Sequence, residues 1–249
     1  MAKPIVHVEG LDGGYFIGKP ILHNLTFSVL PGEMVGLIGL NGAGKSTTIK
    51  HLLGLLQPQR GSVRIGDRQP LRGEQEFRSQ LAYVPESPEL YQELTIREHL
   101  RLTGMVYKLE ETECNRRIDA LGSRFQMTEK LDSFPQHLSK GMKQKVMIMC
   151  AFLVQPPLYI IDEPFLGLDP LSMRSLLELM VAQKRDGAGL LVSSHILSTI
   201  EKYCDRYIVL HKGRTLALGT LEQLREQAGT TRSAGLEDVF FALIGEGVR

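Results

Sequence analysis

The segment from Gly39 to Ser46, which reads GLNGAGKS, constrains the fold more than any other part of this 249-residue chain. It follows the apolar run EMVGLIG, which is typical of a buried strand, and precedes a helical pattern expected from Ser46 to about Leu56. Its three glycines let the backbone wrap around a phosphate group, and the helix adds the partial positive charge of its N-terminus. The pattern therefore predicts a loop that binds the phosphates of a nucleotide.

The side chains of this loop have separate expected roles. Lys45 is expected to contact the β- and γ-phosphates of ATP, Ser46 to coordinate Mg²⁺, and Thr47 to donate to the α-phosphate. The alternative is a glycine-rich turn that matches by chance. A chance match is not expected to have both a buried strand before it and a helix after it. The predicted ATP-binding residues here are Gly39, Leu40, Asn41, Gly42, Ala43, Gly44, Lys45, Ser46 and Thr47.

Two acidic residues follow another apolar run, in the segment LYIIDEP. Asp162 ends the expected strand, where it can hold the Mg²⁺ shell through water. Glu163 beside it is the candidate to polarise the attacking water. An acid at the end of a strand is common, so the pair gains its meaning from the phosphate-binding loop. His195 ends the strand LLVSSH and is expected to reach the γ-phosphate, although a lone histidine is more often structural.

Strand and helix patterns alternate along the chain, which predicts an α/β fold with a largely parallel sheet. We expect a P-loop NTPase (RecA-like) core with an N-terminal antiparallel β region. In that region, IVHVEGL alternates apolar residues like an edge strand, and ILHNLTFSV has the same alternation. Farther along, DRYIVLHKGRTLALG predicts a hairpin that turns at Lys212 and Gly213.

The middle of the chain has a polar, helical pattern that predicts an inserted helical subdomain. It contains a T-x-x-E capping box at Thr95 and Glu98. The segment LEDVFFALIG predicts a short closing helix in the C-terminal tail. We therefore expect a single domain over residues 1–249, with a core at 1–86 and 149–219, a helical subdomain at 87–148 and a helical tail at 220–249.

The segment HLSKGMKQKV, residues 137–146, has two interpretations. Ser139 is a good N-cap, so the segment can be an ordinary helix start. The same helix N-terminus is also an anion site, so it can be half of an active site that another chain completes. Both interpretations can hold together.

Composition and charge exclude several classes of protein. Lys and Arg total 29 and Asp and Glu total 28, so there is no bulk electrostatic case for a nucleic-acid partner. Cys114, Cys150 and Cys204 are far apart and are expected to be buried, unpaired thiols of a reducing compartment. The chain has no signal-peptide pattern and no apolar run of roughly 18 residues, so we expect it to reach a membrane only through a partner or at the surface.

These motifs, in this order, resemble the ATP-binding subunits of the ABC transporter family, and the match covers nearly the whole chain. A tyrosine in LDGGY precedes the phosphate-binding loop; AYVPE leads into the helical segment; LSKGM precedes LYIIDEP, GLDP and SSH. Within the family, the segment from LSKGM to GLDP is most similar to the Ecs-type ATPases of bacterial exporters.

The resemblance implies that two ATPase subunits, identical or different, pack head-to-tail around two ATP molecules. Tyr15 would stack on the adenine, and Asp169 would lie at the dimer seam. The segment matching LSKGM would close over the ATP of the other subunit, with Ser139 and the Gly141 amide facing its γ-phosphate. The residues of this signature segment are Leu138, Ser139, Lys140, Gly141 and Met142.

The sequence departs from the family pattern at two places. Glu86 stands where the family usually has a glutamine that senses Mg²⁺ and water, and we expect Glu86 to keep a metal role. Lys140 and Met142 replace a glycine and a glutamine of the usual L-S-G-G-Q. Ser139 and one glycine remain, so closure around ATP is expected to persist.

The resemblance implies an Mg²⁺-dependent ATPase at the inner face of the cell membrane that powers separate integral membrane permease chains, with export favoured. A soluble ABC ATPase of an assembly pathway, such as Fe–S cluster biogenesis, would show the same motifs. DNA-repair or translation-type relatives would carry a long coiled coil or two fused cassettes, and this chain has neither. A binding module with vestigial hydrolysis is the remaining alternative, and Glu163 and His195 argue against it.

Overall fold

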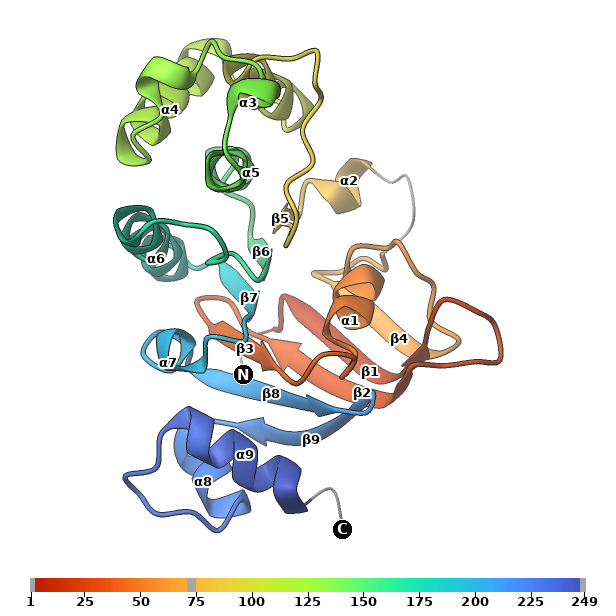
Figure 1. Ribbon diagram of the computed structural model, residues 1–249. Helices are drawn as coiled ribbons and strands as arrows, with labels where there is room; N and C mark the ends of the chain where they lie inside the picture. Colours follow the sequence, from red (N-terminus) through yellow and green to blue (C-terminus); the bar gives the residue numbers. More distant parts are fainter. Residues whose placement is uncertain (1–2, 71–74, 247–249) are drawn as a thin grey trace.

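The computed structural model describes residues 3–70 and 75–246, so the outer ends of the expected single domain lie outside the described residues. Figure 1 shows two β-sheets side by side, with helices α3, α4 and α5 at one end of the molecule and α8 and α9 at the other. The architecture is α/β, with an antiparallel N-terminal sheet and a mixed, largely parallel sheet. It is the P-loop NTPase fold expected from the sequence.

The N-terminal sheet has three antiparallel strands in the order β2-β1-β4. Their bounds are β1 (Val6–Gly13), β2 (Leu22–Val29) and β4 (Arg60–Ile65). The prediction that IVHVEGL forms an edge strand is wrong, because β1 is paired on both sides. Its alternation arises because one face, with Val6, Val8 and Leu11, packs into the core while the other face is partly exposed.

The second sheet has six strands in the order β5-β6-β7-β3-β8-β9, and every neighbouring pair is parallel except β8 with β9. Every residue of β3, β6 and β7 is buried, which is why these strands read as continuous apolar runs. The strand bounds are β3 (Met34–Ile38), β5 (Leu81–Val84), β6 (Leu158–Asp162), β7 (Gly189–Ser193), β8 (Arg206–His211) and β9 (Arg214–Gly219).

The hairpin between β8 and β9 turns where the sequence predicted. Lys212 has φ +47° and Gly213 has φ +74°, and two consecutive positive values match a tight two-residue hairpin turn. A Cβ atom at Gly213 would lie 1.7 Å from the Ile21 carbonyl oxygen, so only glycine fits there. This turn brings the hairpin against the start of β2.

The helix after the phosphate-binding loop is shorter than expected. It ends at Leu52 and not near Leu56, because Gly54 adopts φ +69° and turns the chain. The helices outside the middle segment are α1 (Lys45–Leu52), α2 (Gln75–Arg78), α6 (Pro170–Arg185), α7 (Leu197–Ile200), α8 (Leu221–Gln227) and α9 (Leu236–Glu246). The closing helix predicted from LEDVFFALIG is therefore present as α9.

The middle segment is helical. It holds α3 (Ile96–Val106), α4 (Glu111–Arg124), two short 3₁₀ turns (Thr128–Lys130 and Pro135–His137) and the start of α5 (Lys140–Leu153). The Thr95–Glu98 capping box is confirmed, with both reciprocal hydrogen bonds present. The expected boundary at residue 148 falls inside α5, which continues to Leu153 before the chain enters β6.

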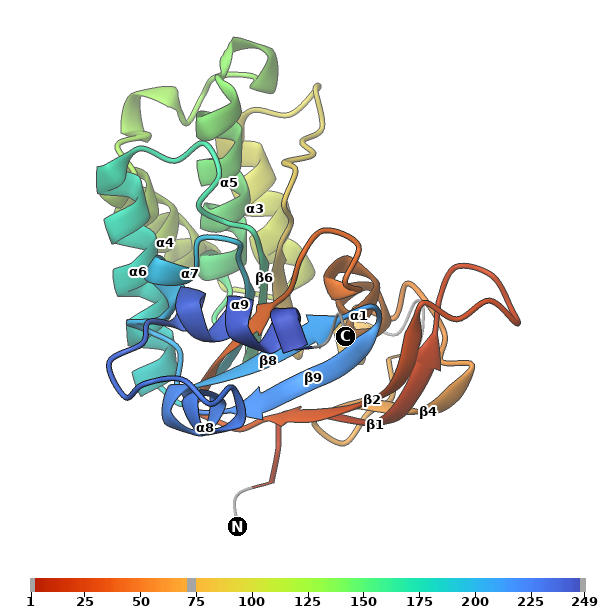
Figure 2. The same ribbon diagram turned by 60° about the horizontal axis from the view of Figure 1, so that its bottom comes forward.

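Two apolar clusters hold these layers together. One lies between the two sheets and α1, and the other joins the far face of the large sheet to the helical segment and to α9. Figure 2 shows α9 lying beside β8 and β9 with α7 close to it. All three cysteines are free thiols. Cys114 is buried, and Cys150 and Cys204 are partly buried.

Candidate functional site

The loop from Gly39 to Ser46 joins the end of β3 to the start of α1 and has the backbone that a phosphate cradle needs. Gly42 and Gly44 adopt φ +79° and +110°, values that L side chains rarely adopt. A Cβ atom at Gly39 would lie 2.6 Å from the Leu210 carbonyl oxygen, so this glycine packs the loop against β8. At Gly42 a Cβ atom would meet nothing within 4 Å, so the loop opens toward the cleft there.

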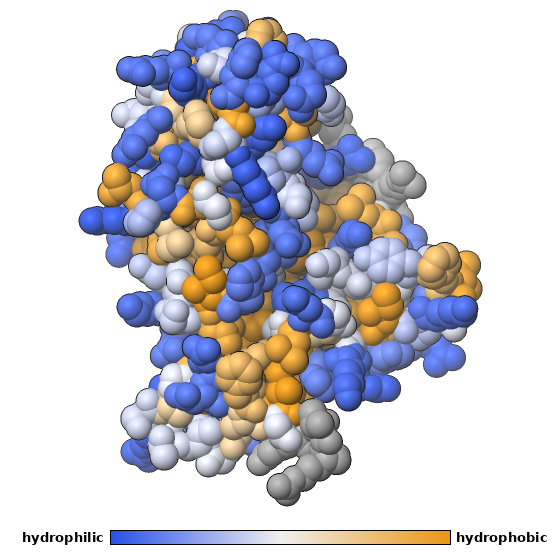
Figure 3. All heavy atoms as spheres, viewed as in Figure 1, coloured by the Kyte–Doolittle hydropathy of each residue, from blue (hydrophilic) through white to orange (hydrophobic). Residues whose placement is uncertain are grey.

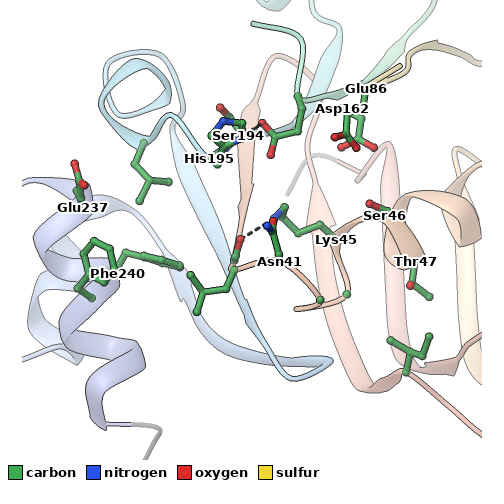
Figure 4. Close-up of a pocket in the computed structure, with 18 residues that line it drawn as sticks. Asn41, Lys45, Ser46, Thr47, Glu86, Asp162, Ser194, His195, Glu237 and Phe240 are labelled. Carbon is green, nitrogen blue, oxygen red and sulfur yellow. Dashed lines mark hydrogen bonds and ion pairs between the residues drawn. The ribbon is translucent and has the colours of Figure 1, made fainter. Parts of the chain in front are cut away.

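The charge of the loop is concentrated at its end. Lys45 is the first residue of α1, and its Nζ donates a hydrogen bond to the Gly39 carbonyl oxygen at 2.7 Å, drawn as a dashed line in Figure 4. The Lys45 side chain therefore spans the loop from its end to its start, and the ammonium group lies near the helix N-terminus. A phosphate oxygen can replace that carbonyl as the acceptor, because both are hydrogen-bond acceptors and the phosphate is charged.

A cleft of about 660 Å³ collects most of the predicted residues, and its size suits a nucleotide. Ala43 is buried beneath the loop and is not among the described residues that line the cleft. The predicted residues that do line it are Gly39, Leu40, Asn41, Gly42, Gly44, Lys45, Ser46, Thr47, Glu86, Asp162, Glu163 and His195.

Asp162 is buried at the end of β6, and the Ser193 hydroxyl of β7 donates a hydrogen bond to it. Burial raises the pKa of the Asp162 carboxyl, and the nearby Glu86 and Glu163 carboxylates raise it further. The negative charge at this position is therefore costly, and a bound cation would relieve that cost.

The oxygen atoms around Asp162 fit Mg²⁺. The Ser46 hydroxyl and the Glu86 carboxylate line the same cleft, and Mg²⁺ prefers such oxygen ligands. Within residues 3–70 and 75–246 there is no cluster of three His, Cys, Asp or Glu side chains of the kind that cages a metal alone. Mg²⁺ in nucleotide sites takes few protein ligands and completes its shell with water and phosphate, so this donor set fits it.

Glu163 and His195 form one hydrogen-bonded unit. His195 Nδ1 lies 2.7 Å from Glu163 Oε2, and the His195 backbone N–H donates to the same oxygen at 3.1 Å. Glu163 adopts φ +46°, which is unusual for a residue with a side chain, and its N–H is held by the carbonyl and hydroxyl oxygens of Ser193. The Glu163 side chain is only 9% exposed whereas that of His195 is 54% exposed, so the imidazole faces the open cleft.

The signature segment lies away from this cleft. Ser139 is the N-cap of α5 and accepts a hydrogen bond from the Met142 N–H at 3.2 Å, so the helix-start interpretation holds within the chain. Residues 138–142 are not among the described residues that line the cleft. Lys140 is exposed, and Met142 packs against the apolar cluster of the helical segment.

Close contacts tie α5 to the segments that follow β6. A Cβ atom at Gly141 would lie 2.3 Å from the Gly167 carbonyl oxygen, so the two backbones touch. Lys145 Nζ lies 2.8 Å from an Asp169 carboxylate oxygen, and Asp169 also caps α6 through the Ser172 N–H and hydroxyl. The hydrogen bond with Lys145 holds the pKa of Asp169 well below its usual range.

Another contact joins α5 to the loop that carries Glu86. Gln144 is buried, and its Nε2 donates to the Pro85 carbonyl oxygen at 3.1 Å. Helix α5 is thus in contact with both the Glu86 loop and the segment leading to Asp169.

Tyr15 lies on the loop after β1 and is 49% exposed. The Lys50 ammonium donates to the Tyr15 hydroxyl at 3.2 Å and lies 4.9 Å from the ring centre. This hydrogen bond lowers the pKa of Tyr15. Tyr15 is not among the described residues that line the cleft, so its contact with adenine stays a prediction.

The position of the C-terminal helix along the cleft was not predicted from the sequence. Glu237, Phe240 and Phe241 of α9 form one wall of it, and Figure 4 shows Glu237 and Phe240 on the opposite side of His195 from Asp162 and Glu86. Hydrophobic side chains gather over α9 on the face shown in Figure 3. The amphipathic pattern predicted the helix, but its place depends on packing between segments far apart in the sequence.

Comparison with known proteins gives consistent matches. The family model described as ABC transporter matches residues 22–166. The ABC-type transporter ATP-binding protein EcsA of Bacillus subtilis (strain 168) is 51% identical over 242 residues, which cover 97% of each chain. No helix within the described residues combines the length and the apolar character needed to cross a bilayer.

Solved structures agree with the sequence comparison. One, described as the structure of an ATP binding subunit of an ABC transporter, superposes with a TM-score of 0.93 and is 54% identical, covering 96% of this chain and 99% of its own. The cbiO1 structure from Clostridium perfringens, described as part of the ABC transporter complex cbiONQ, has a TM-score of 0.76 and 26% identity, covering 90% of this chain and 91% of its own.

Proposed function

The chain belongs to the ABC transporter family, whose members of this type are ATP-binding ATPase subunits, and from that premise we propose how its cleft binds and hydrolyses ATP and what the hydrolysis powers. The cleft holds the phosphates between the loop backbone, the α1 N-terminus and Lys45. Leu40, Asn41 and Thr47 border the same space, and Tyr15 stacks on the adenine from its loop.

Ser46, Asp162 and Glu86 are the residues that would hold Mg²⁺, Ser46 directly and Asp162 through water. The ion would supply positive charge to the phosphates. It would also offset the cost of the Asp162 negative charge, since burial raises the pKa of that carboxyl. In this chain Glu86 takes the position that is usually a glutamine in the family, and its carboxylate binds a cation at least as well as an amide does.

Glu163 and His195 handle the attacking water. The Glu163 carboxylate polarises it, and the imidazole, fixed by the 2.7 Å contact with Glu163, is placed to hydrogen-bond the γ-phosphate and the attacking water. Phosphoryl transfer depends mostly on positioning and charge neutralisation, so a preformed pair of this kind is what the chemistry requires.

The position of the signature segment, outside the cleft of its own chain, supports the proposal of a dimer. The N-terminus of α5, with Ser139 and the Gly141 amide, is built to receive an anion but does not line the cleft of its own chain. A second ATPase subunit packed head-to-tail would bring its α5 onto this cleft. Asp169 would then lie at the seam between the subunits.

The closing and opening of that dimer would drive separate integral membrane permease subunits, with the chain held at the inner face of the cell membrane. The whole chain acts as one ABC ATPase domain, in which residues 87–148 form the helical subdomain facing the permease. The segment from LSKGM to GLDP, and the 51% identity with EcsA, support the Ecs-type branch, and export follows from that resemblance.

A pull-down of the tagged chain from detergent-solubilised native membranes tests this function. A multi-span membrane protein is expected to co-purify in stoichiometric amount, as identified by mass spectrometry. The Lys45→Ala chain is a control that keeps the permease surface but weakens ATP binding. Recovery of soluble partners alone would overturn the transporter proposal and favour an ATPase of an assembly pathway.

A further inference from the structure

We propose that helix α9 is a positioning element of the ATPase site, which holds the His195 segment in place through Glu201 and Phe240. The inference rests on the proposed role of His195 and goes beyond it, because it gives a catalytic task to the C-terminal helix. His195 lies between the end of β7 and the start of α7, a stretch with little regular structure of its own.

Apart from the two contacts of His195 with Glu163, the segment that carries His195 has few constraints of its own. Helix α7 has only four residues, and its N-cap residue Ile196 makes no side-chain capping bond. The Ile196 N–H donates to the Ser194 hydroxyl at 3.0 Å, which shapes the turn but does not attach it to the sheet. Glu163 holds the imidazole itself, so the packing against α7 is what remains to fix the backbone that carries it.

Helix α9 makes that contact through a specific hydrogen bond. Glu201, at the C-cap of α7, accepts the Leu236 N–H of the first α9 residue at 2.8 Å. This N–H is one of the unpaired donors at a helix start, and a carboxylate is the best partner for it. From the other side, Arg225 of α8 donates to the Ala234 carbonyl oxygen at 2.8 Å and fixes the chain just before α9.

Apolar packing continues this contact to the cleft. Leu197 and Ile200 of α7 belong to the same buried cluster as Leu236 and Phe240 of α9. Leu197 and Phe240 are buried and also line the ATP cleft. Figure 4 shows Phe240 on the same side of His195 as Glu237. Buried apolar side chains of α7 and α9 thus lie between Glu201 and the cleft wall beside His195.

A displaced imidazole should slow hydrolysis without weakening ATP binding, because the phosphates are held mainly by the loop and Lys45. A shift of about 1 Å in a catalytic group can cost up to about 100-fold in rate. We expect kcat to fall about tenfold when the hydrogen bond to α9 is lost, with the Kd for Mg·ATP unchanged.

Three variants of the full chain test this. Glu201→Ala removes the acceptor and should lower kcat, whereas Glu201→Gln keeps an acceptor oxygen and should restore it. Glu226→Ala, at an exposed site on α8, is the matched control and should leave kcat as in the parent. Phe240→Leu, which keeps the position apolar, is a second route to a lower kcat if Glu201→Ala does not fold.

Two readouts separate positioning from general destabilisation. In a His195→Ala background, Glu201→Ala should cause no further loss of rate, because its effect passes through His195. The imidazole NMR signals of His195 should shift in Glu201→Ala and stay unchanged in Glu226→Ala.

The proposal is overturned if Glu201→Ala and Phe240→Leu keep the parental kcat, or if the loss is the same with and without His195. The proposed function is tested separately. The parent chain should hydrolyse ATP, and this activity should disappear in Glu163→Gln. If the parent hydrolyses ATP and the Glu201 and Phe240 variants do so at the same rate, only this inference is rejected.

Discussion

The most informative single residue is Glu163, because its backbone and side chain are both constrained. Its φ of +46° is held by two bonds from its N–H to Ser193, and its carboxylate is held by two groups of His195. Strained conformations of this kind persist where the surroundings enforce them, often at active sites. The sequence predicted both residues but could not predict that they form one hydrogen-bonded unit, in which Glu163 is buried and His195 faces the cleft.

Asp169 supports a pH-dependent prediction at the same scale. Asp169→Asn keeps the cap of α6, because Asn is as good an N-cap as Asp, and removes only the charge facing Lys145. We expect the variant to unfold at lower urea concentration at pH 7, with about 1 kcal/mol less stability, since the pair is partly exposed.

The sign of the pH effect follows from the lowered pKa of Asp169. Its contribution to stability is fully present above the unfolded pKa of about 3.9 and is lost as pH falls below it toward the folded value. Urea unfolding from pH 7 down to pH 3 should show the gap between parent and variant closing below about pH 4. A gap that stays constant over this range would mean that the ion pair adds no stability.

At the scale of elements, the sequence predicted what local patterns can encode. The buried strands β3, β6 and β7, the hairpin at Lys212 and the capping box at Thr95 were all predicted from residues adjacent in the chain. What it missed depends on tertiary packing: the central place of β1 and the approach of α9 to the cleft. The early end of α1 was only partly predictable, since Gly54 is visible in the sequence but its left-handed conformation is not.

The same comparison holds for the site. Glycines, lysine and acids at fixed spacing predicted the phosphate loop and the end of β6, because the motif itself specifies their geometry. Glu237 and Phe240 belong to no motif, and no periodicity relates them to the phosphate loop or to the strand ends that form the rest of the cleft.

The contact between α5 and the segment after β6 makes a prediction about elements. Gly141→Ala places a methyl group 2.3 Å from the Gly167 carbonyl oxygen, so one segment must move. We expect a loss of about 1–3 kcal/mol in the free energy of unfolding, as for other overpacked sites. Thermal and urea unfolding of the purified chain measure it.

Gly245→Ala is the matched control, because a Cβ atom there meets nothing within 4 Å among the described residues and alanine favours a helix. It should leave stability unchanged or raise it slightly. If Gly141→Ala were as stable as Gly245→Ala, the close packing of α5 on Gly167 would not describe the protein in solution.

For the whole molecule, the structure brings the predicted catalytic groups of an ATPase together in one cleft and places, elsewhere on the same chain, a helix N-terminus suited to a phosphate. Helix α5 is tied to the Glu86 loop by Gln144 and to Asp169 by Lys145. A partner that docks on the cleft with its own α5 would therefore engage the loops around ATP in both subunits at once. In the proposed dimer, nucleotide binding and subunit association would be coupled.

The most direct test of this account is the mass in solution of the Glu163→Gln chain with Mg·ATP, in which slow hydrolysis keeps the closed state. The account predicts a doubling of the 27.8 kDa mass by light scattering, and the same doubling for the added change Ser139→Thr. Adding Ser139→Asp instead keeps the helix cap but places a negative charge against the partner's γ-phosphate, so this chain should bind ATP and remain a monomer. If the Ser139→Asp chain doubles its mass like its parent, or if the parent binds ATP and stays a monomer, the α5 N-terminus does not complete the site of a second copy.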